Sequence, residues 1–109
     1  MIYAVDFDGT LCTENFPEIG KEIPGRMEAL RRLKANGHKI ILWTCRRNDA
    51  YGDNLTEAIE WCRARGVVFD AVNENLPEIK EKWGGDTRKV YCDYYIDDKN
   101  VSPSFLTSF

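Results

Sequence analysis

The sequence has one histidine, four cysteines and no long hydrophobic run, and each shortage excludes a class of protein. The longest apolar stretches span only a few residues, near 40–43 and 67–69, so no segment is expected to cross a bilayer. Residues 1–8 lack the basic and apolar regions of a signal peptide, so we expect a cytoplasmic protein. The cysteines show no CxxC spacing and His38 stands alone, so neither a zinc site nor a disulfide framework is expected.

Positive charge is not in excess either. The chain has 15 Lys and Arg against 18 Asp and Glu, a net charge of −3 and a sequence pI near 5.2. This balance disfavours broad contact with nucleic acid or an anionic membrane, although a nucleic-acid phosphate end stays open as a substrate. A length of 109 residues with 43% hydrophobic content predicts a single domain, residues 1–109, with a real core.

Apolar strands alternate with amphipathic helices along the chain. Helices are predicted by apolar spacings of three and four residues, at 23–33, 55–62 and 76–83, the last one capped by Asn75. Strands are predicted by short apolar runs, at 2–5, 39–44, 67–72 and 90–96. This alternation predicts an α/β protein, a three-layer α/β/α Rossmann-like parallel sheet with helices on both faces. For residues 101–109 the sequence does not decide between a docked segment and a frayed end.

Polar side chains follow three of these strands at the point where each ends. Asp6 and Asp8 follow the first strand, Thr44 ends the second, and Asp97 and Asp98 follow the fourth. In such sheets ligands bind at the carboxyl ends of the strands, so we expect these side chains to converge. Carboxylates so close together need a cation, and Mg²⁺ favours oxygen ligands together with a substrate phosphate. Calcium is disfavoured because the third loop acid and the distal Glu of an EF-hand are missing, and because the motif follows a strand rather than a helix.

Two neighbouring carboxylates can divide the work of phosphate transfer. A metal beside a carboxylate, the Thr44 hydroxyl and a cation such as Arg46 could receive a phosphate group. One aspartate is then free to attack phosphorus and form an aspartyl phosphate, and a second can give and take the protons. Asp6 and Asp8 are suitably spaced for these two roles.

The ordered set of motifs also resembles a known family. The segment Asp6-Phe7-Asp8-Gly9-Thr10 follows an apolar strand, a Thr ends the second strand, a lysine comes later, and an Asp-Asp pair ends the fourth. In this order, over residues 2–98, the pattern resembles the four motifs of the haloacid dehalogenase (HAD) superfamily. The resemblance implies a HAD-like fold and a phosphatase rather than a dehalogenase, because a halide leaving group needs no proton donor.

Carried over to this chain, the resemblance implies a role for each matching residue. Asp6 would be the nucleophile and a magnesium ligand, and Asp8 the general acid/base, which also binds the metal through its backbone carbonyl. Thr44 would hydrogen-bond the transferring phosphoryl group. Asp97 and Asp98 would complete the metal site, with Asp98 preferred for direct ligation and Asp97 bound directly or through water.

The cations of the site are harder to assign. Lys89, at the start of the fourth predicted strand, is our choice for the third motif, and Lys80 and Lys82 on the preceding helix compete with it. Lys99 is interpreted as a solvated loop charge. The Thr-x-Arg spacing places Arg46 like the phosphate-binding arginine of some family members, whose guanidinium holds phosphate bidentately; a surface arginine is the alternative.

The chain leaves no room for the cap domain that many HAD members carry. Residues 11–23 allow only a short flap, and 73–89 hold one short helix. We therefore expect an open site, suited to a bulky or macromolecular phosphate or to a homo-oligomer in which a neighbour supplies the lid. The expected function is magnesium-dependent phosphomonoester hydrolysis. The alternative is a non-catalytic phosphate-binding or regulatory module; a receiver-like domain is disfavoured because Asp70 lies inside its predicted strand.

Overall fold

The computed structural model describes residues 1–108 and contains a four-stranded parallel sheet with the strand order β5-β2-β1-β6. The sheet strands are β1 (Ile2–Val5), β2 (Lys39–Leu42), β5 (Ala71–Val72) and β6 (Tyr94–Ile96). The helices are α1 (Arg26–Ala35), α2 (Asn54–Ala64), α3 (Pro77–Trp83) and the 3₁₀ helix η1 (Pro103–Ser108). A separate antiparallel hairpin joins β3 (Asn48–Asp49) to β4 (Gly52–Asp53).

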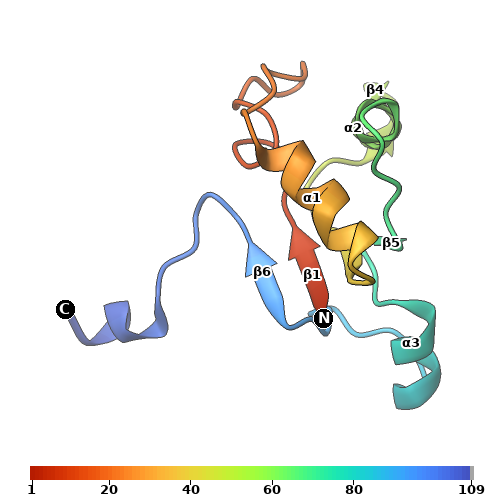
Figure 1. The fold of residues 1–109 in the computed structure, drawn as a ribbon, viewed down its shortest axis with the longest axis vertical. Helices are drawn as coiled ribbons and strands as arrows, with labels where there is room; N and C mark the ends of the chain where they lie inside the picture. Colours follow the sequence, from red (N-terminus) through yellow and green to blue (C-terminus); the bar gives the residue numbers. More distant parts are fainter. Residues whose placement is uncertain (109) are drawn as a thin grey trace.

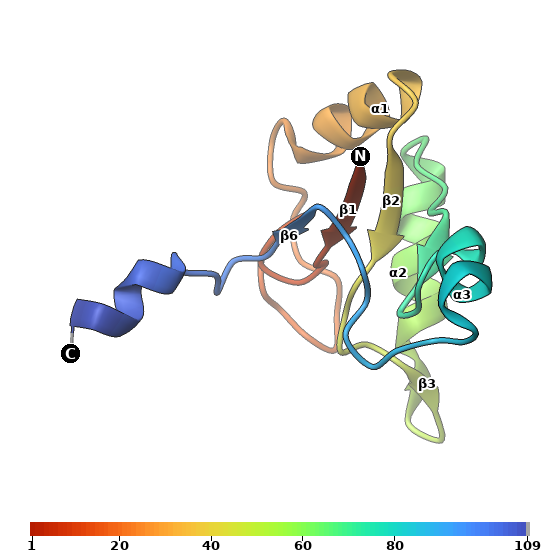
Figure 2. The ribbon, with the colours of Figure 1, turned by 90° about the horizontal axis from the view of Figure 1, so that it is seen from below.

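Side chains that alternate along the central strands divide the core into two layers. On one face Val5 and Leu42 pack in a cluster with Met27 of α1 and Cys62 of α2. On the other face Ala4 and Ile41 pack with Leu76 and Val90, against which Ile79 of α3 also packs. Helices therefore cover both faces of the sheet, which confirms the predicted three-layer α/β/α Rossmann-like fold (Figures 1 and 2).

The order of the strands creates a switch point beside β1. The chain proceeds from β1 through β2 to β5 at one edge of the sheet, and then crosses back by way of α3 to place β6 on the other side of β1. Figure 1 shows β1 and β6 side by side. Ligand sites of open α/β sheets lie at such a reversal, outside the carboxyl ends of the strands. The residues after β1 and β6 are thus the first place to look for a site.

Three strands are shorter than the sequence predicts: β2 ends at Leu42 rather than at residue 44, and β5 and β6 begin later than expected. Only Ala71 and Val72 of the predicted 67–72 strand pair with β2, because Val67 is buried under the helices of the first core layer instead. In the predicted 90–96 strand the start is diverted, because the backbone N–H of Tyr91 donates to the Asn75 side chain at 2.6 Å. The buried Asn75 side chain therefore holds this loop in place by a hydrogen bond. The prediction that Asn75 caps α3 is wrong, because the N-cap residue is Leu76.

The loops around the sheet hold no folded cap within residues 1–108, as expected. The predicted short flap, residues 11–23, lies in the segment that joins β1 to α1. Residues 101–108 lead away from the sheet into η1, so this part of the tail projects rather than docks (Figures 1 and 2), and residue 109 lies outside the described residues. No described helix is both long and apolar enough to cross a membrane. All four cysteines are unpaired, as the sequence predicts.

Candidate functional site

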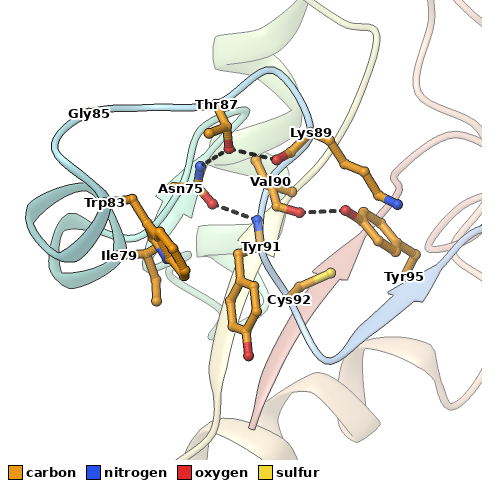
Figure 3. Close-up of a pocket in the computed structure, with 10 residues that line it drawn as sticks. All are labelled: Asn75, Ile79, Trp83, Gly85, Thr87, Lys89, Val90, Tyr91, Cys92 and Tyr95. Atoms are coloured by element: carbon orange, nitrogen blue, oxygen red, sulfur yellow. Dashed lines mark hydrogen bonds between the residues drawn. The ribbon is translucent and has the colours of Figure 1, made fainter.

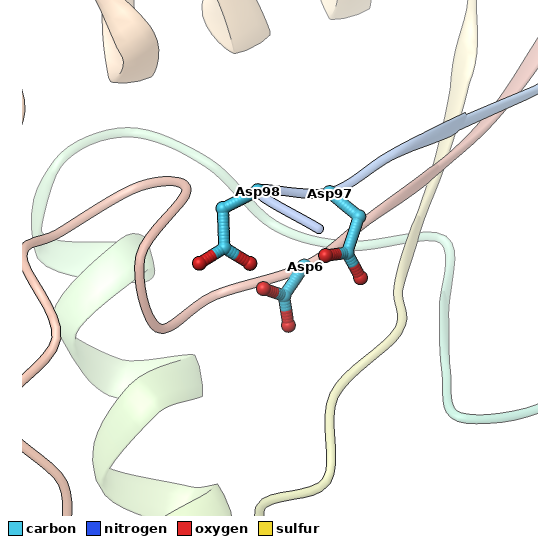
Figure 4. A group of neighbouring side chains, drawn as sticks. All are labelled: Asp6, Asp97 and Asp98. Atoms are coloured by element: carbon cyan, nitrogen blue, oxygen red, sulfur yellow. The ribbon is translucent and has the colours of Figure 1, made fainter. Parts of the chain in front are cut away.

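Three carboxylates converge where β1 and β6 end. Asp6 directly follows β1, and Asp97 and Asp98 directly follow β6. The parallel pairing of Val5 with Ile96 brings the two strand ends level, and the N–H of Asp6 donates to the carbonyl of Ile96 at 2.9 Å. One oxygen from each carboxylate lies within 4.8 Å of the others, and Figure 4 shows the three side chains turned toward one another.

Gly9 is required for this convergence. Its φ of +83° lies in the left-handed region, where residues with a side chain are strained. A Cβ at this position would also come within 2.3 Å of an Asp98 carboxylate oxygen. Gly9 therefore permits both the turn after β1 and the close approach of the Asp98 carboxylate to that turn.

The electrostatics of Asp6 are those of a partly buried acid among acids. The pKa of Asp6 is raised from 3.8 to about 6. Desolvation by burial is the main cause, and the negative charges of Asp97 and Asp98 contribute to the rise. A hydrogen bond from the N–H of Phe7 and one from the Thr10 hydroxyl, at 3.3 Å, act in the opposite direction. Ionised Asp6 is thus destabilised in the absence of a cation.

The donor set fits a hard divalent cation. The three carboxylates offer only oxygen ligands, and the acid repulsion at Asp6 would be relieved by a positive ion among them. Sites for Mg²⁺ typically use one or two carboxylates and leave other positions to water and phosphate. Asp6, Asp97 and Asp98 are therefore the residues that could hold a metal.

A lysine is already paired with this cluster. The Lys99 ammonium lies 3.1 Å from one Asp98 oxygen and 3.3 Å from the other, and this contact is the main cause that lowers the pKa of Asp98. The Lys99 backbone N–H also donates to Asp97 at 2.8 Å. The Lys99 side chain is 78% exposed, which confirms the prediction of a solvated loop charge, but the prediction did not include this contact with Asp98.

Asp8 lies beside the cluster but has a different partner. Both of its carboxylate oxygens accept hydrogen bonds from Arg46, at 2.8 Å from Nε and 2.8 Å from Nη2. The Arg46 side chain is 1% exposed and that of Asp8 15%. The paired carboxylate is the main cause that raises the pKa of Arg46, so this is a fixed, charged, bidentate pair.

The remaining donors of Arg46 connect the flap to the start of α2. Nη1 donates to the carbonyls of Pro17 and Asn54, each at 3.3 Å, and Nη2 donates to the carbonyl of Glu18 at 3.1 Å. With the two bonds to Asp8, all five N–H donors of the guanidinium are used. Arg46 has no donor left for a phosphate, so its assignment as a substrate-binding residue is corrected: it is a buried clasp between the flap, α2 and Asp8.

Thr44 is held at the mouth of the site by its backbone. Its N–H donates to the Asn73 side chain at 2.8 Å, and its hydroxyl oxygen accepts the N–H of Arg46 at 3.1 Å. Asn73, with a positive φ of 53°, is a turn residue that orients Thr44. The hydroxyl proton of Thr44 is not used in these bonds, and its predicted contact to a phosphoryl group stays a prediction.

These residues surround one cavity of about 310 Å³. The aspartates that follow β1 and β6 line it together with Lys99, with residues of the flap and with residues of the loop after β2. The lining residues are Asp6, Asp8, Glu14, Phe16, Thr44, Cys45, Arg46, Asp97, Asp98 and Lys99. The structure thus brings together every predicted site residue except Lys89.

Lys89 lines a different cavity, of about 410 Å³, between α3 and the loop that leads to β6 (Figure 3). Its ammonium lies 5.6 Å from the centroid of the Tyr95 ring. Its competitors also have other partners: Lys80 pairs with Glu74 at 2.6 Å, and Lys82 lies 5.5 Å from the Trp83 ring. Among the described lysines, the one that lines the acidic cavity is Lys99. The assignment of Lys89 to that cavity is corrected, because the 84–93 loop turns Lys89 toward Tyr95.

Comparison with known proteins identifies a relative of this chain. A solved structure of a conserved protein coded by a locus of Bacteroides thetaiotaomicron matches with a TM-score of 0.80 and 48% sequence identity, over 93% of this chain and 78% of that chain. No protein-family model matches the chain, and no curated protein matches it significantly. At this identity and coverage, the chain belongs to the same protein family as that conserved Bacteroides protein.

Proposed function

We propose that this protein is a magnesium-dependent phosphohydrolase of the capless HAD type, which cleaves phosphate monoesters through an aspartyl phosphate on Asp6. The observation that carries the proposal is the convergence of Asp6, Asp97 and Asp98 within 4.8 Å at the switch point of a parallel sheet. Asp8, two residues from the nucleophile, lines the same cavity. This arrangement supplies a nucleophile, a proton-transfer group and oxygen ligands for a cation.

In the first step a carboxylate oxygen of Asp6 attacks phosphorus. A phosphorus–oxygen bond forms to Asp6 while the bond to the leaving alcohol breaks, and the alcohol oxygen takes a proton from Asp8. The hydroxyl of Thr44 and the ammonium of Lys99 lie in the same cavity, where they can orient the phosphoryl oxygens. A bound Mg²⁺ would neutralise phosphoryl charge and be held by Asp6, Asp97 and Asp98, with the Asp8 carbonyl as a further ligand.

In the second step a water molecule attacks the phosphorus of the aspartyl phosphate. Asp8 takes a proton from that water, the bond between phosphorus and the Asp6 oxygen breaks, and inorganic phosphate and free Asp6 carboxylate result. With both oxygens accepting from Arg46, Asp8 is in the form that receives this proton. To donate in the first step, the protonated Asp8 must release one of its two bonds to Arg46.

The proposal is tested by measuring inorganic phosphate released from a panel of phosphate monoesters that includes sugar, nucleoside and phosphopeptide phosphates. We expect turnover of at least one panel member with Mg²⁺, and none after metal removal with EDTA. A protein that is stabilised by Mg²⁺ and phosphate but releases no product from any panel member would be a binding or regulatory module, and the proposal of an enzyme would fail.

The pairing of Lys99 with Asp98 gives a second, activity-independent prediction. Because the Lys99 ammonium competes with a metal for the Asp98 oxygens, Lys99→Met should tighten Mg²⁺ binding by about two- to fivefold, the range expected for an exposed ion pair. Lys89→Met is the matched control and should leave the affinity unchanged, since Lys89 lines the other cavity. Isothermal titration calorimetry measures both, and unchanged or weaker binding in Lys99→Met would contradict the prediction.

A further inference from the structure

The acidic cavity continues beyond the aspartates. A neighbouring cavity of about 410 Å³ shares Phe16 and Cys45 with it and extends toward the β3–β4 hairpin. This outer groove is also lined by Tyr51, Arg47 and other hairpin or flap residues. Because a phosphate monoester has one substituent beyond the phosphate, the space next to the aspartates is where that substituent can lie.

Phe16 forms the wall between the two cavities and is held firmly. The Arg46 guanidinium lies 5.1 Å from the centroid of the Phe16 ring, and it also binds the carbonyls of the next two residues of the flap. The flap is closed at its base by hydrogen bonds in both directions between Thr13 and Lys21, each 2.8 Å long. Phe16 nevertheless stays 53% exposed, so the ring is positioned in advance and available for contact.

Tyr51 lines the outer groove from the opposite element. It is 95% exposed at the turn of the β3–β4 hairpin, and its N–H donates to Asp49 at 2.9 Å. The hairpin is anchored to α2, because the Asn48 side chain accepts the N–H groups of Leu55 and Thr56. A large aromatic side chain exposed on an anchored hairpin, beside a cavity, is a contact surface without a partner inside the described chain.

We infer that the groove between Phe16 and Tyr51 binds the leaving group of the substrate, and that this leaving group presents a planar, unsaturated ring. The inference rests on the proposed phosphohydrolase function, whose substrate class it narrows. Both contact side chains are flat aromatic rings, which stack on planar groups in offset or edge-to-face geometry. Among the described residues, the charged side chains that line the outer groove are Arg47 and Asp49. They pair with each other at 3.2 Å, so the groove selects for shape more than for charge.

The expected selectivity follows from the contact chemistry. An aromatic pair contributes beyond its buried area by an amount equivalent to about three- to tenfold in affinity, and a saturated ring of equal size keeps only the area. The Phe16 ring, which packs on Arg46, loses little conformational freedom on binding, so most of its contribution is realised. Benzyl phosphate should therefore be preferred over cyclohexylmethyl phosphate, although both release primary alcohols of similar size.

The experiment compares these two phosphates by KM, and the matching phosphonates by calorimetric Kd with Mg²⁺, because phosphonates bind without turnover. In the wild-type protein we expect the aromatic ligand to bind about three- to tenfold more tightly. Tyr51→Ala and Phe16→Leu should each reduce this preference at least about twofold. Trp83→Ala, which removes an exposed aromatic ring from the cavity beside α3, should not change it.

Two results would overturn the inference. Equal Kd values for the two phosphonates in the wild-type protein would show that the groove does not recognise planar rings, as would failure of both to bind. A preference that survives both Tyr51→Ala and Phe16→Leu would place the recognition elsewhere. The proposed function fails by a different result, the absence of phosphate release from the whole panel, so the two failures are distinguishable.

Discussion

Replacement of Asp6 by Asn will abolish phosphate release and, at the same time, stabilise the metal-free protein at pH 7. An amide cannot attack phosphorus as a carboxylate does, so the turnover rate should fall by at least about 1,000-fold. Unfolding would also abolish activity, but it would lower the melting temperature. The opposite signs of the two effects therefore separate a lost nucleophile from a lost fold.

The stability gain follows from the raised pKa of Asp6. Burial raises the pKa of Asp6 from its ordinary value of 3.8 to about 6 in the folded protein, so folding disfavours the ionised form. The resulting penalty is absent below about pH 4, grows between pH 4 and 6, and is complete above pH 6. Asn carries no charge and removes the penalty. After allowance for solvent screening of this half-exposed group, we expect a gain of about 1 kcal/mol at pH 7, or about 4 °C in melting temperature.

Thermal denaturation of the metal-free proteins at pH 4 and pH 7, together with phosphate release at pH 7, measures both effects. The gain should be present at pH 7 and absent at pH 4. Asp70→Asn is a matched control, because Asp70 binds Lys34 at 2.9 Å and the N–H of Ile40 at 2.8 Å, away from the cavity. It should lose stability and keep activity. An Asp6→Asn protein that still turns over at the wild-type rate would remove Asp6 from the role of nucleophile.

Replacement of Arg46 by Met will destabilise the fold more than any surface change. The substitution leaves the Asp8 carboxylate without its cation and removes the donors to the carbonyls of Pro17, Glu18 and Asn54. Breaking a buried ion pair at one partner typically costs about 3–5 kcal/mol. Since a domain of this size is stable by about 5–15 kcal/mol, a large share of the total would be lost. Arg46→Lys keeps the charge but not the planar fork, and should fall between Met and wild type.

Urea denaturation followed by tryptophan fluorescence gives the free energies of unfolding for these variants. Arg32→Met is the control, because Arg32 forms a surface pair with Glu28, and the two side chains are 70% and 62% exposed. Its loss should stay within about 0.5 kcal/mol. If Arg46→Met were as stable as Arg32→Met, the five hydrogen bonds of Arg46 would not be what fastens the flap.

The position of the acidic residues in the fold could be predicted, because it depends on short sequence patterns that form strands and helices. Apolar composition predicts the strands 2–5 and 39–44, which the structure contains as β1 and, two residues shorter, β2. The candidate residues follow or end strands that must run parallel once helices alternate with them: Asp6, Asp8, Thr44, Asp97 and Asp98. Carboxyl ends of parallel strands share one edge of the sheet, so the convergence of the acids needed no tertiary information. The predicted first residues of the last two strands were wrong. At 67–70 and 90–93 the backbone is diverted by burial of Val67 in the core and by the hydrogen bond from Tyr91 to Asn75, contacts between residues far apart in the sequence.

The partner of each charged side chain could not be predicted from the sequence. Thr-x-Arg spacing is equally compatible with an arginine that binds phosphate and with a buried arginine that holds loops together. Arg46 is 2% exposed and donates to five acceptor atoms from three segments, which decides for the second role. Likewise Lys89 and Lys99 are both lysines near an acid pair, and only the path of the loops turns the first toward Tyr95 and the second toward Asp98. Chain periodicity determines which edge of the sheet carries the acids, because strands and helices are local. The direction of long, flexible cationic side chains depends on acceptors that the folded chain brings together, so the tertiary structure alone decides it.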